Sequence, residues 1–148
     1  MRDNPDLGIT VDCAEAQVLA RFWCHALGYV EAPPPKGWAD WSSFLTDQGV
    51  PEEEWGDGAT IRPPTGEGPS ISFLRVPEAK TVKNRIHLDL KVSGGRHVDQ
   101  AVRRTRIRAV EADLVAHGAR SVRDDTDEDG RLDHVVMQDP EGNEFCVV

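Results

Sequence analysis

The sequence predicts an α+β fold built from two βαβββ modules, because the chain nearly repeats itself. Ile9–Cys13 and Ile86–Leu90 each alternate apolar and polar residues and carry an aspartate at the same place. Each run precedes an amphipathic segment of helical periodicity that stops at a glycine, Gly28 in the first half and Gly118 in the second. Internal repetition of this kind fixes the architecture and identifies which positions correspond.

The first half is predicted to contain a strand, a helix and a later hairpin. Gly8–Cys13 has the period-two alternation of a strand. The helix that follows carries apolar residues at helical spacing, at Val18 or Leu19, Phe22 or Trp23, and Ala26 or Leu27. Residues 29–32 are predicted to form a short strand, and residues 59–62 and 70–76 a hairpin around a Pro/Gly-rich turn.

An irregular insert, starting at Pro33 and ending in the turn at Gly66, interrupts the first half. Within it, Trp38, Trp41 and Phe44 recur at spacings of three, which predicts a short helix with an aromatic face. Such a face serves either as a lid over a flat apolar ligand or as core that covers the edge of the sheet.

The second half repeats the order of the first. We predict a link over residues 77–84, a strand over 85–91 and a helix over 98–117. The buried stripe of this helix is predicted to comprise Val98, Val102, Ala109, Val110 and Leu114. Three further strands are predicted over residues 120–123, 132–138 and 144–148. The two modules then span residues 8–76 and 85–148 of a single domain.

Size and charge limit the kinds of partner. A chain of 148 residues suits one domain with its own core. The formal net charge of −9 argues against binding to nucleic acid or to an anionic membrane surface, since both attract basic patches. The three cysteines show no Cys-x-x-Cys spacing, and neither a charged-then-apolar leader nor an apolar run near ~18 residues is present. These features predict a cytoplasmic protein.

Two motifs carry a resemblance to a known family. The second half opens with His-Leu-Asp-Leu at residues 87–90 and closes with Asp-Pro-Glu-Gly-Asn-Glu-Phe at residues 139–145. Together with the doubled βαβββ order, these motifs resemble the vicinal oxygen chelate superfamily, and within it the glyoxalase/bleomycin-resistance-like proteins of the glyoxalase-like domain branch. The resemblance implies a curled mixed sheet with an open cleft, a small-molecule ligand and a homodimer.

Strand alternation predicts which side chains face that cleft. His87, Asp89 and Glu144 should share one face in the second half, as Thr10 and Asp12 should in the first. The apolar residues between them should pack under the helix: Ile86, Leu88, Leu90, Phe145 and Val147.

The resemblance implies that metal ligands, where present, come from the opening and closing strands of each half. The corresponding positions in this chain are Thr10, Ser72, His87 and Glu144. Hydroxyl groups are poor metal donors, so we expect no cofactor, with His87 and Glu144 as hydrogen-bonding groups of a metal-free pocket. The alternative is a divalent Zn, Ni, Mn or Fe ion held by His87 and Glu144, with Asp12 joining them if the register differs by two residues. His134 is either a third ligand or a strand residue bonded to its neighbours.

Two functions remain open from these residues. The first is a lyase or isomerase that acts by proton transfer, with Glu144 as general base and His87 orienting or polarising a substrate oxygen. The second is a metal-free protein that sequesters a drug or metabolite, resembling the bleomycin-resistance proteins. In either case the ligand-binding residues are predicted to be Thr10, Asp12, Trp38, Trp41, Ser72, Arg75 and Asp89.

One acidic run imitates a metal site. Asp125, Asp127, Asp129 and Gly130 match the start of a calcium loop. Val136 stands where such a loop needs its bidentate glutamate, so an acidic turn is predicted instead.

Overall fold

The computed structural model describes residues 7–148 and confirms the predicted α+β class. The chain divides into two compact units between Ala79 and Lys80, inside the predicted link. We call the residues up to Ala79 the first module and the residues from Lys80 onward the second module. Each module holds its own four-stranded mixed sheet. Across residues 7–148, none of the helices combines the length and the apolar character that a membrane crossing requires.

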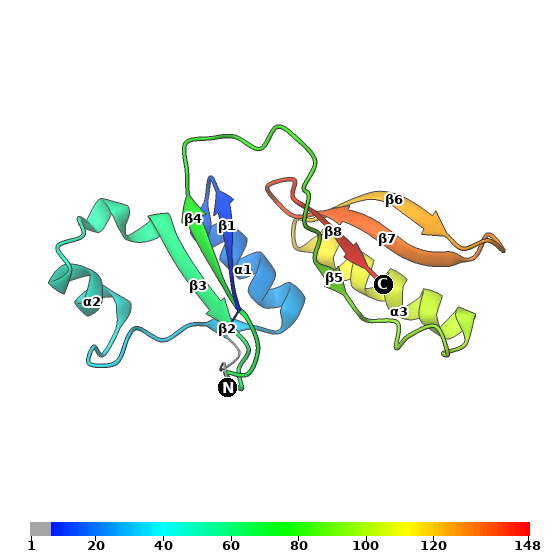
Figure 1. Ribbon diagram of the computed structural model, residues 1–148, viewed down its shortest axis with the longest axis horizontal. Coiled ribbons are helices and arrows are strands. Elements are labelled where there is room, and N and C mark those ends of the chain that lie inside the picture. The colour runs from blue at the N-terminus through cyan, green and yellow to red at the C-terminus, as the bar shows by residue number, and fades with distance from the viewer. Residues whose placement is uncertain (1–6) are drawn as a thin grey trace, which may run out of the picture. The chain divides into compact units, whose positions relative to one another are not determined.

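The first module contains the predicted strand–helix order with an insert. Its elements are β1 (Gly8–Cys13), α1 (Ala16–Leu27), β2 (Val30–Glu31), α2 (Trp41–Asp47), the 3-10 helix η1 (Glu52–Asp57), β3 (Gly58–Arg62) and β4 (Ser70–Arg75). The strand order is β1-β4-β3-β2, with β1 parallel to β4 and the other neighbours antiparallel. α1 packs against the sheet, while α2 and η1 form the insert between β2 and β3 (Figure 1).

The core of the first module lies between α1 and its sheet. Its main side chains are Leu19, Phe22 and Trp23 from the helix and Ile61, Ile71 and Phe73 from the sheet. α1 ends at the predicted glycine, because Gly28 adopts a φ of 65°, a left-handed conformation that costs a glycine little. The N–H of Tyr29 then donates to the carbonyl oxygen of Cys24 at 3.0 Å and closes the helix end.

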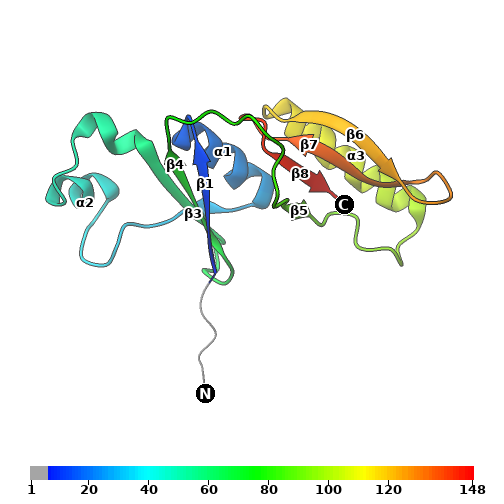
Figure 2. The same cartoon turned by 45° about the horizontal axis from the view of Figure 1, so that its top comes forward.

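The second module repeats this arrangement without the insert. Its elements are β5 (Asp89–Leu90), α3 (Gln100–Ala116), β6 (Arg120–Thr126), β7 (Leu132–Gln138) and β8 (Glu144–Val147). The strand order is β5-β8-β7-β6, again with the first and last strands parallel. α3 runs along one face of this sheet (Figure 2). Asp99 caps the helix, since its carboxylate accepts the N–H groups of Ala101 and Val102 at 2.9 and 3.2 Å.

The opening strand of the second module is shorter than predicted. Of the predicted strand over residues 85–91, the ladder includes only Asp89 and Leu90. Leu88 still accepts the N–H of Cys146 through its carbonyl oxygen at 2.9 Å. Ile86 is 80% exposed, so the prediction that it packs under the helix is wrong. The chain leaves the sheet edge upstream of Leu88, and the burial of Ile86 is lost with the pairing.

The buried stripe of α3 also differs from the predicted one. Its buried residues are Arg103, Ile107 and Leu114, whereas Val102 is 41% exposed. The stripe was misassigned because an arginine occupies one of its positions. The Arg103 guanidinium donates to the side-chain oxygen of Gln100 at 3.2 Å and pairs with Asp133 at 3.6 Å. These two polar contacts at the tip of the side chain allow its apolar stem to be buried.

The run of aspartates between β6 and β7 is a turn that uses its own carboxylates. Oδ1 of Asp127 accepts the backbone N–H groups of Asp129 and Arg131 at 3.0 and 2.9 Å. The guanidinium group of Arg131 also pairs with both Asp127 and Asp129.

The observed stripe predicts the effect of two substitutions on α3. Ile107→Ala should lower the free energy of unfolding by about 2–5 kcal/mol, because it removes a fully buried side chain and leaves a cavity. Val102→Ala, on the same helix, should change it by less than about 1 kcal/mol, since this side chain is largely in solvent. Urea denaturation of both variants measures this. Equal losses in the free energy of unfolding for the two variants would contradict the observed stripe and favour the one predicted from the sequence.

Candidate functional site

Three hydroxyl side chains lie next to one another across the sheet of the first module. Thr10 of β1 pairs in register with Ser72 of β4, and Ser72 pairs with Thr60 of β3. The Ser72 Oγ and Thr60 Oγ1 atoms are 3.1 Å apart, a hydrogen bond in which either can donate. All three belong to one sheet face, because directly paired residues on neighbouring strands point the same way. We call Thr10, Thr60 and Ser72 the hydroxyl row.

The hydroxyl row lines a pocket of about 430 Å³ in the first module. The insert supplies an aromatic and apolar wall through Trp41 and Leu45 of α2 and Trp55 of η1. Glu31 of β2 and Glu54 of η1 add two carboxylates. The other lining residues are Gln17, Gly58, Ala59, Phe73 and Leu74. Apolar walls with a few polar groups, at this volume, are typical of a site for a small organic molecule.

Both indole rings of the pocket are held through their N–H groups. Nε1 of Trp41 donates to the carbonyl oxygen of Ala32 at 2.8 Å, and Nε1 of Trp55 donates to that of Val50 at 3.0 Å. Trp41 also meets the ring of Phe44 edge to face, with ring centroids 5.7 Å apart. These contacts position the rings without a ligand, which lowers the entropy cost of binding one.

The local sequence explains why α2 starts directly at Trp41. Asp40 is the N-cap, and its carboxylate accepts the N–H of Ser43 and the hydroxyl of Ser42, both at 2.7 Å. These bonds, led by those from Ser43, hold the pKa of Asp40 below its ordinary value. The cap therefore fixes the point at which the aromatic wall begins.

The structure brings some predicted ligand-binding residues of the first module together and leaves others apart. Those that line the pocket are Thr10, Trp41 and Ser72. Trp38 does not line it and instead packs edge to face on Phe44, with centroids 5.0 Å apart. Arg75 pairs with Asp57 at 3.1 Å, and Asp12 is exposed on β1 outside the pocket.

In the second module, His87 and Glu144 are each engaged by a lysine. Glu144 opens β8 with a side chain that is 12% exposed, and its carboxylate accepts the N–H of Asn84 at 3.0 Å. Nζ of Lys80 lies 3.1 Å from the same carboxylate oxygen. His87 is exposed in the segment before β5, and its Nε2 atom accepts a hydrogen bond from Nζ of Lys83 at 2.8 Å. Both groups therefore have polar partners within the module.

These contacts change the acidity of Glu144. The bond from the N–H of Asn84, followed by that from the backbone N–H of Glu144 itself and by the ammonium group of Lys80, lowers the pKa of Glu144 to about 2. A general base works best with a pKa near the operating pH. At neutral pH the Glu144 carboxylate is consequently a weak base.

The same contacts do not suit a divalent metal. A metal ligand needs a free lone pair, but Nε2 of His87 is used by Lys83 and the charge of Glu144 is neutralised by Lys80. The corresponding first-module positions, Thr10 and Ser72, offer only hydroxyl groups. Within residues 7–148, His87 and Glu144 belong to no cluster of three or more metal-ligating side chains. Their donor set does not fit a catalytic metal, and no chemical step is derived through one.

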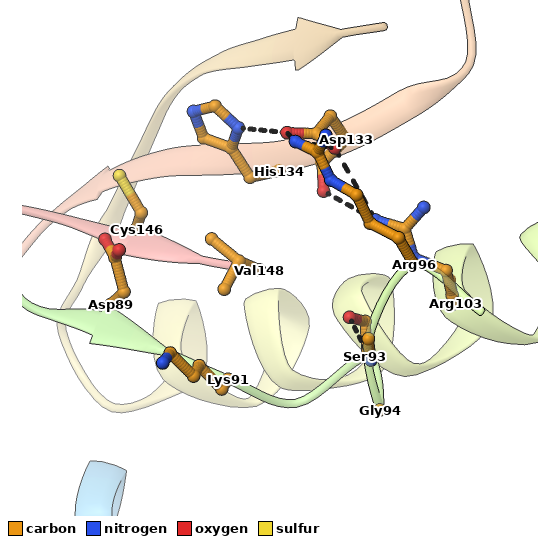
Figure 3. A pocket seen from close by; sticks show the side chains of 11 residues that line it. Asp89, Lys91, Ser93, Gly94, Arg96, Arg103, Asp133, His134, Cys146 and Val148 are labelled. Carbon is orange, nitrogen blue, oxygen red and sulfur yellow. Dashed lines mark hydrogen bonds and ion pairs between the residues drawn. The ribbon is translucent and has the colours of Figure 1, made fainter. Parts of the chain in front are cut away.

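A second pocket, of about 610 Å³, lies in the second module and includes Asp89 (Figure 3). Asp89 lies beside Cys146, and burial, with Asp89 as the next cause, raises the pKa of the Cys146 thiol. His134 also lines this pocket, with Nδ1 3.1 Å from Asp133 and Nε2 3.0 Å from Asp125. His134 is therefore a strand residue bonded to its neighbours.

The second pocket carries charges of both signs. Asp133 pairs with Arg96 at 3.3 Å and with Arg103 at 3.6 Å, as the dashed lines in Figure 3 indicate. Asp89 and Lys91 add one further charge of each sign. Positive and negative groups thus largely offset one another along its wall.

Sequence reasoning missed several residues of both sites. Glu54 and Trp55 lie in a 3-10 turn, which is too short for a periodic signal. Thr60 could have been found, because the predicted hairpin places a residue of its first strand opposite Ser72. The contact between Asn84 and Glu144 joins residues 60 positions apart in the chain, and no local sequence pattern predicts it.

The contact between Lys80 and Glu144 predicts a pH-dependent contribution to stability. The pKa of Glu144 is depressed to about 2 in the fold, against about 4.3 in an unfolded chain. The ionised carboxylate therefore stabilises the fold fully above about pH 4.3, by on the order of 2–3 kcal/mol, and this is lost as the pH falls through about 2. The difference in free energy of unfolding between wild type and Glu144→Gln should shrink over that window, as urea denaturation can measure.

Glu78→Gln provides a control that removes an equal charge from an exposed position and should change stability by less than about 0.5 kcal/mol. If the difference between wild type and Glu144→Gln stays constant from pH 6 down to pH 2, the contacts of Glu144 described above do not form.

The comparison with known proteins extends over nearly all the described residues. A family model described as a glyoxalase-like domain matches residues 8–148. No curated protein matches the chain.

Several solved structures share the fold at low sequence identity. A glyoxalase/bleomycin resistance protein/dioxygenase family enzyme from Burkholderia phytofirmans matches with a TM-score of 0.60 and 13% identity over 97% of each chain. A mutant of the fosfomycin resistance protein FosX from Listeria monocytogenes, complexed with Mn(II) and 1S,2S-dihydroxypropylphosphonic acid, gives a TM-score of 0.58 and 10% identity over 99% of this chain and 90% of that chain. The hypothetical protein SA1046 from S. aureus gives a TM-score of 0.58 and 12% identity over 99% of this chain and 97% of that chain. From its family match over residues 8–148, this chain belongs to the glyoxalase-like domain family, and its two βαβββ modules share the fold of these solved structures.

Proposed function

We propose that this protein binds a small organic molecule in the pocket of the first module and needs no metal ion to do so. The observation that carries the proposal is the pair of indole rings, Trp41 and Trp55, which hydrogen bonds to the backbone hold in place beside the hydroxyl row. Aromatic faces take a flat apolar body, and hydroxyl groups bond polar atoms at its edge. This function is closest to the sequestering alternative.

The donor sets of both modules support a metal-free site. The FosX neighbour is solved with Mn(II), but an identity of 10% carries only the fold to this chain. In the first module the positions equivalent to His87 and Glu144 are hydroxyl-bearing, and in the second module two lysines engage those groups. Binding through aromatic contacts and hydroxyl groups requires no cation.

Proton transfer at Glu144, the enzyme function predicted from the sequence, has less support. With a pKa of about 2, Glu144 retains little tendency to take a proton at neutral pH. Lys80 would also have to leave the carboxylate before a substrate proton could reach it.

The proposal predicts binding of a neutral flat probe. Protein treated with EDTA should bind 1-naphthylmethanol at one site per chain in isothermal titration calorimetry. Trp41→Leu and Trp55→Leu should each weaken binding about tenfold, because each removes an aromatic face of the pocket. Ser72→Ala, which leaves the apolar wall intact, should weaken it less.

The matched control is Trp38→Leu. This tryptophan lies in the same insert but does not line the pocket, so its loss should change affinity less than about threefold. Thermal denaturation establishes that each variant folds. The proposal would be refuted if binding appeared only after a divalent metal is added. It would also be refuted if neither Trp41→Leu nor Trp55→Leu weakened binding.

We also propose that the protein forms a homodimer. Each four-stranded sheet has two edge strands, β1 and β2 in the first module and β5 and β6 in the second. Unpaired edges offer free N–H and C=O groups that favour pairing with another chain. Light scattering at micromolar concentration should give twice the chain mass of 16.4 kDa. A mass of one chain throughout that range would rule the dimer out.

A further inference from the structure

We infer that the pocket of the first module selects an organic cation, that is, a flat apolar body carrying an ammonium or similar positive group. This inference rests on the proposed function, since it names the class of ligand for that same pocket.

The charges of the lining residues are all of one sign. Glu31 and Glu54 line the pocket, and none of its lining residues is a lysine, arginine or histidine. Two carboxylates in the lining of a largely apolar pocket create a negative potential that favours a positive ligand. A carboxylate or phosphonate ligand would meet the same groups as like charges.

Within residues 7–148, no ion pair neutralises these two carboxylates. Neither the Glu31 nor the Glu54 side chain has an ion-pair or hydrogen-bond partner in the described part of the chain. Asp57, three residues after Glu54, is by contrast paired with Arg75 at 3.1 Å outside the pocket. Glu31 and Glu54 therefore keep their negative charges available to a ligand in the pocket.

The aromatic wall adds a second attraction for positive charge. A cation placed over the face of an indole ring is attracted by the electrons of the ring, and tryptophan is the best side chain for this contact. Trp55 follows Glu54 directly in η1, so a carboxylate and an indole are supplied by one turn. Both groups attract a cation bound in the pocket.

The second pocket shows that this charge pattern is local and not a consequence of the net charge of −9. That pocket is lined by Lys91, Arg96 and Arg103 beside Asp89 and Asp133. Two of its cations are paired with Asp133. Selection for a cation is therefore expected in the first module alone.

Three probes with the same ring separate charge from shape. Naphthalen-1-ylmethylammonium, 1-naphthylmethanol and 1-naphthoate differ mainly in the charge of one substituent. Calorimetry on full-length EDTA-treated protein at about 0.15 M salt, where distant charges are screened, should show the ammonium binding at least about fivefold more tightly than the alcohol. The carboxylate should bind most weakly of the three.

Matched variants locate the selectivity. Glu31→Gln and Glu54→Gln should each reduce the preference of the ammonium over the alcohol by about twofold or more. Glu53→Gln removes the same charge from the neighbouring position of η1, outside the pocket, and should leave the preference as it is in wild type.

The outcomes distinguish this inference from the proposed function. If the alcohol binds through Trp41 and Trp55 but the ammonium binds no more tightly, the pocket is a small-molecule site without charge selection, and the inference fails alone. The same holds if Glu53→Gln reduces the preference as much as Glu54→Gln. If none of the three probes binds at millimolar concentration, the proposed function and the inference both fail.

Discussion

The parallel pairing of the first and last strands in each module is the constraint on which both candidate sites depend. It aligns Thr10 with Ser72 in the first module and Asp89 with Cys146 in the second, although these residues lie far apart in the chain. A shift by one residue would turn every side chain of the strand to the other face. The buried Ile71 and Phe73 on the face that α1 covers therefore help to fix Ser72 in the hydroxyl row.

The two modules share this strand arrangement, but different side chains line their pockets. The first module adds α2 and η1 between β2 and β3, and that insert supplies the aromatic wall of the pocket that the hydroxyl row and two carboxylates also line. In the second module no helix lies between the corresponding strands, β6 and β7. There, Lys80 pairs with Glu144 and Lys83 bonds to His87, the two polar residues to which the family resemblance drew attention. The proposed ligand site therefore lies in the module that lacks His87 and Glu144.

The sequence was sufficient where local patterns decide structure. Alternation of apolar and polar residues identified β1, β4 and β8, and Gly28 marked the end of α1. Both signals lie within a short segment of the chain, so the sequence alone shows them. It was insufficient where distant residues compensate one another. Arg103 could be buried only because Gln100 and Asp133 receive its guanidinium group, and a hydrophobicity pattern does not count such partners.

The candidate site was predictable to a similar extent. Thr10, Trp41 and Ser72 followed from strand equivalence and aromatic spacing, whereas the carboxylates of Glu31 and Glu54 joined them only through the tertiary fold. Glu144 was found by motif, but its low pKa depends on Lys80 and Asn84, which the motif does not include.

The central claim is that a ligand contacts two particular indoles of the first module without a metal. The four tryptophans of the chain give four indole N–H signals in a proton–nitrogen correlation spectrum, each assignable by substitution. When naphthalen-1-ylmethylammonium is added to EDTA-treated protein, the signals of Trp41 and Trp55 should shift with one common saturation curve. Those of Trp23, which is buried in the core, and Trp38 should move far less. A shift of all four signals alike, or of Trp38 without Trp41 and Trp55, would contradict the account.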